Sequence, residues 1–240
     1  MSSGTFQRHE VKFLLNRKQR MALELAMQDH MQQDQYGEST ICSLYYDTRD
    51  FRLIRRSMEK PVYKEKLRLR SYGPAQQDGM VFVELKKKYD GIVYKLRISM
   101  KEAQASRYLA GETHLPEDSQ IGREIDWFKK YYRELLPAVY LCYDRIAYFS
   151  REDADLRITF DRNIRWRDQE LTLVSAPWGR QLLQPGQSLL EIKTSSAIPV
   201  WLAKALSENN IRMTTFSKYG RAYTIMQERN TMRERGVYCA

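Results

Sequence analysis

The segment VYKEKLRLRSYG, residues 62–73, carries a cationic side chain at every second position along most of its length. Successive side chains of a β-strand point to opposite faces of the sheet, so this alternation predicts a strand with one cationic and one mostly apolar face. A sheet built from such strands must bury one face and find compensation for like charges on the other. The cationic positions are Lys64, Lys66, Arg68 and Arg70.

The same two-residue period recurs along the chain. The tripeptide YDG at 89–91 separates two such segments and predicts a hairpin turn. Mostly sequential strands of this kind indicate an antiparallel sheet. We expect strands at residues 7–15, 40–47, 62–73, 79–88, 91–100, 138–150, 154–167 and 188–195.

Helical patterns occupy the intervals between these strands. Asn16 is a suitable N-cap for the first helix, and a stripe of apolar residues at helical spacing marks the segment 122–136. About eight strands with helices in their connections give an α+β fold, and eight strands can close into a barrel. Helices are expected at 17–30, 48–59, around 106–111, and at 122–136, 198–210 and 217–229.

The polar face of nearly every expected strand is dominated by Arg and Lys, with few carboxylates. A sheet face that is merely solvated normally mixes Ser, Thr, Gln, Glu and Lys. A row of like charges is tolerated when a polyanion lies among them, so the pattern predicts a basic concave surface or bore. The charged positions beyond residues 62–73 are Glu10, Lys12, Glu84, Lys86, Lys88, Lys95, Arg97, Arg145, Asp155, Arg157, Asp161, Glu191 and Lys193.

The overall charge agrees with an anionic partner. The 240 residues include 40 basic and 30 acidic side chains, for a net charge of +10. Such a balance suits nucleic acid, a membrane surface or a phosphorylated small molecule, although a basic soluble surface is the simpler alternative. The cationic faces carry few of the aromatic residues that stack on bases, so we expect phosphate binding rather than nucleic-acid binding.

Several other functions lack their sequence signals. The chain has no GxxxxGK[ST] or GxGxxG loop, and its three histidines form no zinc motif. Cys42, Cys142 and Cys239 lie far apart, which argues against a disulfide framework. No apolar signal segment and no membrane-spanning apolar run is found, so we expect a cytoplasmic protein.

The few carboxylates among the cations allow two interpretations. Carboxylates are ligands for a hard divalent cation that is shared with phosphate oxygens. They can equally form internal salt bridges with neighbouring Arg and Lys side chains. The residues in question are Glu10, Glu84, Asp161 and Glu191.

Eight short motifs occur in a characteristic order: RHEVKF, LYYDT, KLRLRSYG, FVELKKK, YDRIAY, LRITFDRNI, LLEIKT and FSKYGRAY. Together they resemble the VTC domain, the polyphosphate polymerase module of the vacuolar transporter chaperone complex. That family belongs to the triphosphate tunnel metalloenzymes, which are related to CYTH proteins. The resemblance implies one domain over residues 1–240, with a core at about 7–228 and a loose C-terminal tail. It also implies an antiparallel eight-stranded β-barrel with helices packed around it.

The resemblance further implies a set of site residues. The catalytic set is Lys12, Arg68, Arg70, Lys86, Arg145, Arg157 and Lys218. Lys95 and Ser217 are implied substrate ligands, and the face analysis adds Lys66, Arg97 and Lys193. The family's metal carboxylate falls on Glu191, for Mn²⁺ or Mg²⁺, and Glu10 is a further candidate ligand.

Two features depart from relatives of the family. Hydrolytic CYTH proteins begin with ExExK, whereas the corresponding positions here are Arg8, Glu10 and Lys12. Loss of the first carboxylate favours the VTC-like interpretation over hydrolysis. The chain also has no room for the SPX domain or the membrane segments of the full complex, so membrane association would need a tethering partner.

The expected reaction transfers the γ-phosphoryl group of ATP to a growing polyphosphate chain and releases ADP. One alternative is hydrolysis of tripolyphosphate or a nucleoside triphosphate, with Glu10 or Glu84 orienting water. The other alternative is a module that binds polyphosphate or triphosphate without catalysis.

Overall fold

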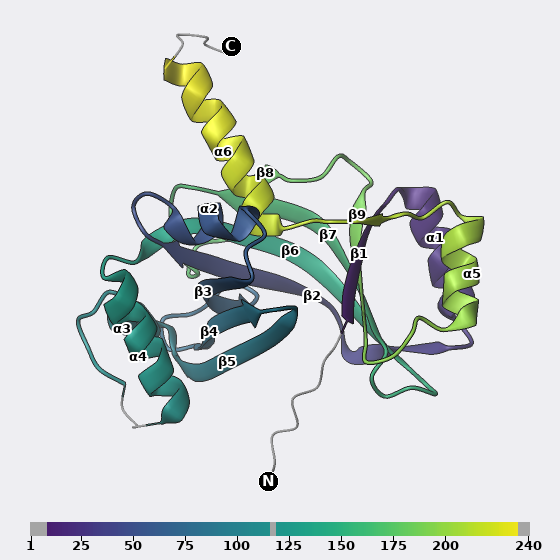
Figure 1. The fold of residues 1–240 in the computed structure, drawn as a ribbon, viewed down its shortest axis with the longest axis horizontal. Coiled ribbons are helices and arrows are strands. Elements are labelled where there is room, and N and C mark those ends of the chain that lie inside the picture. Colours follow the sequence, from purple (N-terminus) through teal and green to yellow (C-terminus); the bar gives the residue numbers. More distant parts are fainter. Residues whose placement is uncertain (1–8, 116–118, 235–240) are drawn as a thin grey trace. The chain divides into compact units, whose positions relative to one another are not determined.

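The computed structural model describes residues 9–115 and 119–234, which form six helices and ten strands (Figure 1). The helices are Arg17–Met27 (α1), Arg52–Met58 (α2), Glu102–Leu109 (α3), Gln120–Tyr132 (α4), Val200–Glu208 (α5) and Lys218–Glu234 (α6). The strands are His9–Leu15 (β1), Met31–Asp47 (β2), Tyr63–Tyr72 (β3), Met80–Tyr89 (β4), Ile92–Lys101 (β5), Leu136–Ser150 (β6), Arg157–Arg167 (β7), Arg180–Gln181 (β8), Ser188–Thr194 (β9) and Met213–Thr214 (β10).

The fold class is α+β, as the sequence predicts, but the strand count and closure differ from the expected barrel. The ten strands form one sheet in the order β10-β1-β9-β7-β6-β2-β3-β4-β5, with β8 paired to β7. Over the described part of the chain this path ends at β10 and β5, so the hydrogen-bonded sheet is open. The additional strands β8 and β10 have two residues each, too few to produce a two-residue period in the sequence.

The chain divides into two compact units, each assembled from three separate segments. The first unit comprises Met1–Thr40, Tyr143–Ile164 and Leu183–Phe216. The second unit comprises Ile41–Cys142, Arg165–Leu182 and Ser217–Ala240. The long strands β2, β6 and β7 each contribute residues to both units.

In the first unit, the apolar face of β1, β7 and β9 packs against α1 and α5, which lie side by side (Figure 1). Helix α1 begins as predicted at Asn16, whose side chain accepts a hydrogen bond from the Gln19 backbone N–H while the Gln19 side chain accepts one from the Asn16 N–H. This reciprocal capping satisfies two backbone donors at the start of the helix. The principal buried residues are Phe13, Leu15, Leu23, Met27, Phe160, Leu190, Ile192 and Leu202.

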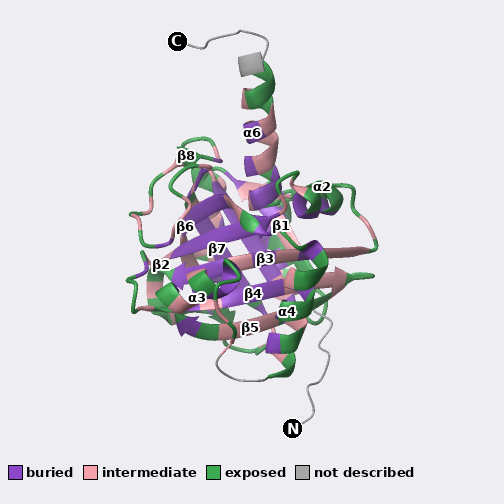
Figure 2. Ribbon diagram, turned by 90° about the vertical axis from the view of Figure 1, so that its left-hand side faces the viewer, coloured by how far each residue is buried: buried purple, intermediate pink, exposed green. Residues whose placement is uncertain are grey.

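In the second unit, the apolar face of β3, β4 and β5 packs against α3 and α4. Buried and partly exposed residues follow one another along β3 and β4, as the colours of Figure 2 show. Cys42 and Cys142 are buried in the same core. The principal core residues are Leu67, Leu69, Val83, Leu85, Tyr108, Ile125, Phe128 and Tyr132.

The predicted hairpin between β4 and β5 is confirmed. Tyr89 pairs with Ile92, and the two residues between them, Asp90 and Gly91, have φ values of 43° and 83°. Positive φ at both central positions gives the turn whose twist matches that of antiparallel strands.

Some expected boundaries are corrected. Helix α4 ends at Tyr132, because Arg133 has a φ of 59° that a helix cannot continue, and Leu136 begins β6 instead. Strand β2 begins at Met31, nine residues before the expected start, through a polar segment with no clear alternation. Helix α6 continues to Glu234, into the expected loose tail, and residues 235–240 lie outside the described chain.

Candidate functional site

The second unit presents its cations in rows that run across β3, β4 and β5. In one row Lys66 is opposite Lys86, which is opposite Lys95. In the next row Arg68 is opposite Glu84, which is opposite Arg97. The three-lysine row places like charges directly across neighbouring strands, an arrangement that destabilises a sheet unless an anion compensates it.

Glu84 is the centre of this cationic face. Its carboxylate is 2.6 Å from an Arg68 nitrogen, 2.8 Å from Arg97, 3.2 Å from Lys95 and 3.8 Å from Arg70, and the side chain is 1% exposed. Burial alone raises the pKa of this carboxyl, but the cations, Arg68 first, lower the pKa to about 2. Of the two interpretations of Glu84, the internal salt bridge is therefore the one that these contacts support.

Strand β2 orients the two arginines of β3. Arg68 Nη1 donates to the Tyr45 hydroxyl at 3.0 Å, and Arg70 Nε donates to the Ser43 hydroxyl at 3.3 Å. These bonds fix the guanidinium planes, which matters for groups that bind phosphate through a planar fork. Sequence reasoning missed Tyr45, because an aromatic residue in a strand is typical of the core; its alternation with Ser43 was the available signal.

Ser217, directly before α6, and Lys218, its first residue, add polar groups to the second unit. The Ser217 hydroxyl accepts a hydrogen bond from Lys66 Nζ at 3.2 Å and one from the Gly220 backbone N–H at 3.1 Å. Lys66 and Ser217 are 151 positions apart in the chain. The motif FSKYGRAY is thereby joined to the cationic strand KLRLRSYG, two segments that the sequence assigned to one site.

The anchor of this turn is a buried carboxylate. The Tyr219 hydroxyl donates to Asp47 Oδ2 at 2.8 Å, while Asp47 also accepts the backbone N–H groups of Leu53 and Ile54 at the start of α2. Burial raises the pKa of Asp47, although these four donors, including the Thr48 N–H, act to lower it. Asp47 thus links β2, α2 and α6 through hydrogen bonds rather than through a salt bridge.

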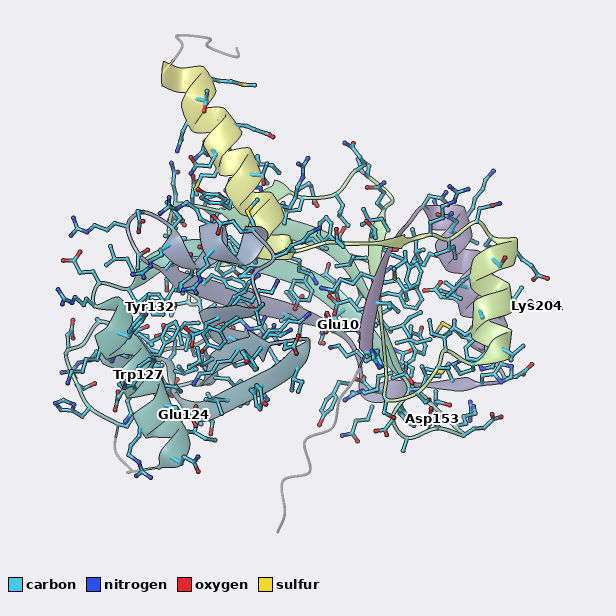
Figure 3. The ribbon with its side chains drawn as sticks, in the orientation of Figure 1. Glu10, Glu124, Trp127, Tyr132, Asp153 and Lys204 are labelled. Atoms are coloured by element: carbon cyan, nitrogen blue, oxygen red, sulfur yellow. The ribbon has the colours of Figure 1, made fainter. Side chains whose placement is uncertain are left out.

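The first unit carries the other predicted residues on the polar face of β1, β9 and β7. Lys12 is opposite Glu191 and Glu10 is opposite Lys193. Arg157, which is exposed, is in turn opposite Lys193. The polar face contains Glu10, Lys12, Arg157, Asp161, Glu191 and Lys193, and Figure 3 labels Glu10 on β1.

Carboxylates hold the cations of the first unit in place. Arg145 donates to both oxygens of the fully buried Asp161, at 2.6 and 2.7 Å, and to Glu191 at 3.2 Å. Burial opposes the charge of this guanidinium, but Tyr143, Asp161 and Glu191 raise the pKa of Arg145 well above its usual value. Two carboxylates fix this side chain, so it presents a pre-oriented cation.

Glu10 and Glu191 converge on one cation. Lys12 Nζ is 3.1 Å from Glu10 and 3.3 Å from Glu191, and it also donates to the Phe216 carbonyl at 3.2 Å. Within residues 9–115 and 119–234 no group of three or more His, Cys, Asp or Glu side chains could hold a metal ion alone. Mg²⁺ sites commonly use one or two carboxylates and complete their coordination with phosphate oxygens and water, and this pair fits that arrangement.

The predicted residues therefore fall into two groups. Contacts or strand pairing bring Glu10, Lys12, Arg145, Arg157, Glu191 and Lys193 together in the first unit. They bring Lys66, Arg68, Arg70, Lys86, Lys95, Arg97 and Ser217 together in the second. Lys218 follows Ser217 in the chain as the first residue of α6. Arg8, which replaces the first carboxylate of ExExK, lies outside the described residues.

Comparison with family models identifies the family of this chain. The sequence model of the VTC domain matches residues 7–227. This chain belongs to the VTC domain family. A search of curated proteins found no match. In the VTC domain described here, no helix among residues 9–115 and 119–234 has the length and apolar character needed to cross a membrane.

Solved structures show the fold to which this VTC domain is similar. A "putative adenylate cyclase" from Bacillus halodurans has 14% sequence identity and a TM-score of 0.52, over 88% of this chain and 95% of that chain. Another "putative adenylate cyclase", from Vibrio parahaemolyticus, has 12% identity and a TM-score of 0.48, over 92% and 99%. The protein HpAC1 from Hippeastrum, described as having a dominant triphosphatase activity, has 17% identity and a TM-score of 0.49, over 88% and 92%. At these identities the likeness concerns the fold alone.

Proposed function

We propose that this VTC domain is a polyphosphate polymerase that transfers the γ-phosphoryl group of ATP to a polyphosphate chain. The observation that carries the proposal is the cationic face of the second unit. Glu84 is its one carboxylate over the described positions of β3, β4 and β5, and Lys66, Lys86 and Lys95 face one another across the strands. A chain of phosphates carries one negative charge for every repeat, so it is the kind of ligand that such rows of cations would bind.

The proposal assigns binding of the phosphates to the second unit. Arg68 and Arg70 would contact non-bridging oxygens through their planar guanidinium groups, whose orientation Tyr45 and Ser43 already fix. The lysines would supply point charges without a demanding geometry. The proposed ligands are Lys66, Arg68, Arg70, Lys86, Lys95, Arg97, Ser217 and Lys218.

The first unit would supply the groups for charge compensation at the reacting phosphate. Arg145, held by Asp161, and Arg157 are the proposed cations, together with Lys12 and Lys193. Glu191 and Glu10 would hold Mn²⁺ or Mg²⁺ jointly with substrate oxygens, and a bound ion would neutralise phosphate charge. Lys12 contacts both of these carboxylates.

The chemical step requires no covalent intermediate with the protein. An oxygen of the terminal phosphate of the chain attacks Pγ of ATP, the bond from Pγ to the β-phosphate oxygen breaks, and ADP leaves. The nucleophile is already an anion, so no general base is required. The site then contributes alignment and electrostatic stabilisation, which are the main factors in phosphoryl transfer.

Hydrolysis of tripolyphosphate or a nucleoside triphosphate is the second candidate function. It needs a carboxylate that can orient water. Glu84 is poorly suited, because it is buried and shared among four cations, whereas the Glu10 side chain is 30% exposed. Glu10 is therefore the residue on which a hydrolytic reaction would depend. Binding of polyphosphate without turnover is the third outcome.

The proposed function implies particular ligands and a particular location for the protein. ATP and inorganic polyphosphate or triphosphate are the proposed ligands, without nucleic acid, and the cytoplasm is the proposed location. Membrane association would require a tethering partner. One domain over residues 1–240 is the proposed functional unit.

One incubation separates the three functions. The protein is mixed with ATP and Mn²⁺, and the products are separated for long-chain polyphosphate, ADP and free phosphate. Polyphosphate with stoichiometric ADP supports the polymerase. Free phosphate with stoichiometric ADP and no polyphosphate supports the hydrolase, and neither product with retained polyphosphate binding supports the binding module. The same incubation is repeated with Arg157→Ala, which should lose turnover. The arginine is exposed, so its removal should not disturb a core contact.

A further inference from the structure

Tyr45 lies on the cationic face of the second unit although it is aromatic. It is directly opposite Arg68 in the β2–β3 pairing and is 8% exposed. Its hydroxyl accepts a hydrogen bond from Arg68 Nη1 at 3.0 Å, and the Arg68 guanidinium carbon is 5.8 Å from the centre of its ring. The hydroxyl therefore belongs to the same group of polar atoms as the arginines.

The ring of Tyr45 is held in a fixed position. It stacks on Tyr219 with ring centres 4.8 Å apart and planes at 28°. Tyr219 is itself fixed, because its hydroxyl donates to the buried Asp47 at 2.8 Å. A donor that is held in place before the ligand arrives loses little entropy on binding, so its hydrogen bond contributes more to affinity.

A phenol that accepts a hydrogen bond from Arg68 still has its own proton to donate. We propose that Tyr45 is a further ligand of the bound anion, and that its O–H donates to a phosphate oxygen that Arg68 also contacts. Loss of the phenol proton would remove this donor and turn Tyr45 into an internal counter-ion for Arg68. The inference deepens the proposed function by adding a residue and a pH dependence to the anion site, but it requires only that the site binds a phosphate chain.

The charged groups that face Tyr45 favour its ionisation. Burial acts to raise the pKa of Tyr45, yet Arg68, Arg70 and Lys66 on β3 lower the pKa to about 8. On α6 the facing group is Tyr219, and on β2 itself Asp47 lies two residues away. Below pH 8 the phenol is a neutral donor, and above pH 8 it becomes an anion that repels phosphate. Affinity for a polyanion should therefore fall as the pH rises through this range, by up to about tenfold per pH unit.

The test measures binding alone, without ATP or metal. Long-chain polyphosphate is the probe, because the charge of its internal phosphates does not change between pH 7 and pH 9.5. Its affinity is measured by titration calorimetry over this range for the wild type and for Tyr45→Phe. We expect Tyr45→Phe to bind about tenfold more weakly at pH 7, the effect of one hydrogen bond to a charged group. We also expect a flatter pH profile, so that the two affinities converge above pH 9.

Tyr46→Phe is the matched control. Tyr46 is the next residue on the same strand and is buried in the core of the second unit, where burial and Glu102 raise its pKa. Its substitution removes the same atom from the opposite face and should leave the pH profile unchanged. Burial lowers the pKa of Lys95 despite its contact with Glu84, and both variants retain this lysine, so any titration of Lys95 cancels between them.

A spectroscopic titration tests the ionisation of Tyr45 directly, without a comparison of affinities. The phenolate absorbance near 295 nm, taken as wild type minus Tyr45→Phe, should show a transition near pH 8 that polyphosphate moves upward. Equal affinity and equal pH dependence for wild type and Tyr45→Phe would overturn the inference, as would a transition that polyphosphate does not move. Failure to make polyphosphate from ATP would instead contradict the proposed function and leave these binding results standing.

Discussion

The polar faces of the two units differ in how far their charges are balanced. In the first unit, three carboxylates lie among four cations, and Arg145 and Lys12 each contact two of the carboxylates. In the second unit, Glu84 is shared among four cations while a row of three lysines crosses the strands. The first arrangement orients individual groups, and the second gathers positive charge that a polyanion can neutralise.

This difference separates two tasks that phosphoryl transfer needs. A long anion must be held along its length, which an excess of cations achieves without exact geometry. The reacting phosphate must be aligned and its charge compensated, which needs groups in fixed positions. Variants in the second unit should therefore affect binding most, and variants in the first unit should affect the chemical step most.

The largest expected effect is on turnover, from removing one arginine in each unit. Arg68→Ala and Arg157→Ala should each lower the rate of polyphosphate synthesis by about 1,000-fold, the upper range for one electrostatic contact. Arg68→Ala should also weaken polyphosphate binding, whereas Arg157→Ala should leave most of the affinity. Steady-state rates and calorimetric affinities are compared. Equal losses of affinity in both variants would contradict the division of tasks.

Neither arginine should be required for folding. After Arg68→Ala, Glu84 retains Arg97 at 2.8 Å and Lys95 at 3.2 Å, and repulsion within the cationic face decreases. The free energy of unfolding should then change by less than about 1 kcal/mol. A clear decrease for both variants in denaturant titrations would show that these residues stabilise the fold.

The second expected effect is on stability, from removing the central carboxylate of the second unit. Glu84→Gln leaves four cations without their counter-ion and should lower the free energy of unfolding by about 3 kcal/mol. Glu191→Gln should cost only about 1 kcal/mol, since Arg145 keeps Asp161 and Lys12 keeps Glu10. Denaturant titrations without phosphate give both values, and added polyphosphate should restore more stability to Glu84→Gln than to Glu191→Gln.

Acid titration gives an independent measure of Glu84. Its folded-state pKa is lowered from the usual 4.5 to about 2, so its contribution is present above pH 4.5 and is lost as the pH falls toward 2. The wild type should therefore lose about 3 kcal/mol of stability through this group over that interval. The stability difference between wild type and Glu84→Gln should shrink over the same interval. A difference that stays constant below pH 4 would assign the lowered pKa to another carboxyl.

The third effect concerns Glu191 and sharpens the assignment of chemistry to the first unit. Glu191→Gln keeps the shape of the side chain and removes one negative charge among cations. Polyphosphate affinity should persist or increase slightly, whereas synthesis with Mn²⁺ should fall about 100-fold. Synthesis near the wild-type rate would exclude the metal role of Glu191, and Glu10→Gln would then be the variant to examine.

The smallest expected effect is thermal stabilisation by the ligand. Polyphosphate at ten times its dissociation constant should stabilise the wild type by about 1.4 kcal/mol, which corresponds to a few degrees in Tm. The shift should decrease as salt is raised, because exposed ionic contacts are screened. Glu84→Gln should show a larger shift than Glu191→Gln. A shift that does not depend on salt would contradict ionic binding.

The local features of this protein can be predicted from its sequence. The two-residue period places Lys66, Arg68 and Arg70 on one face and Leu67 and Leu69 on the other, and the structure agrees. Residues 89–91 give the hairpin, and Asn16 gives the helix cap, because both depend on a few adjacent residues. The excess of cations over carboxylates is likewise visible in the sequence, since it is a count rather than a contact.

The contacts between charged side chains depend on the tertiary structure. The four contacts of Glu84 depend on the register of β3, β4 and β5, and a shift of one residue would move its side chain to the apolar face. From the sequence, Tyr45 is expected to be a core residue, and only its pairing with Arg68 places it on the cationic face. Ser217 contacts Lys66 although 151 positions separate them in the chain. Periodicity is a local property of a strand, whereas register, long-range pairing and the division into two units arise from packing of distant segments, which no local pattern encodes.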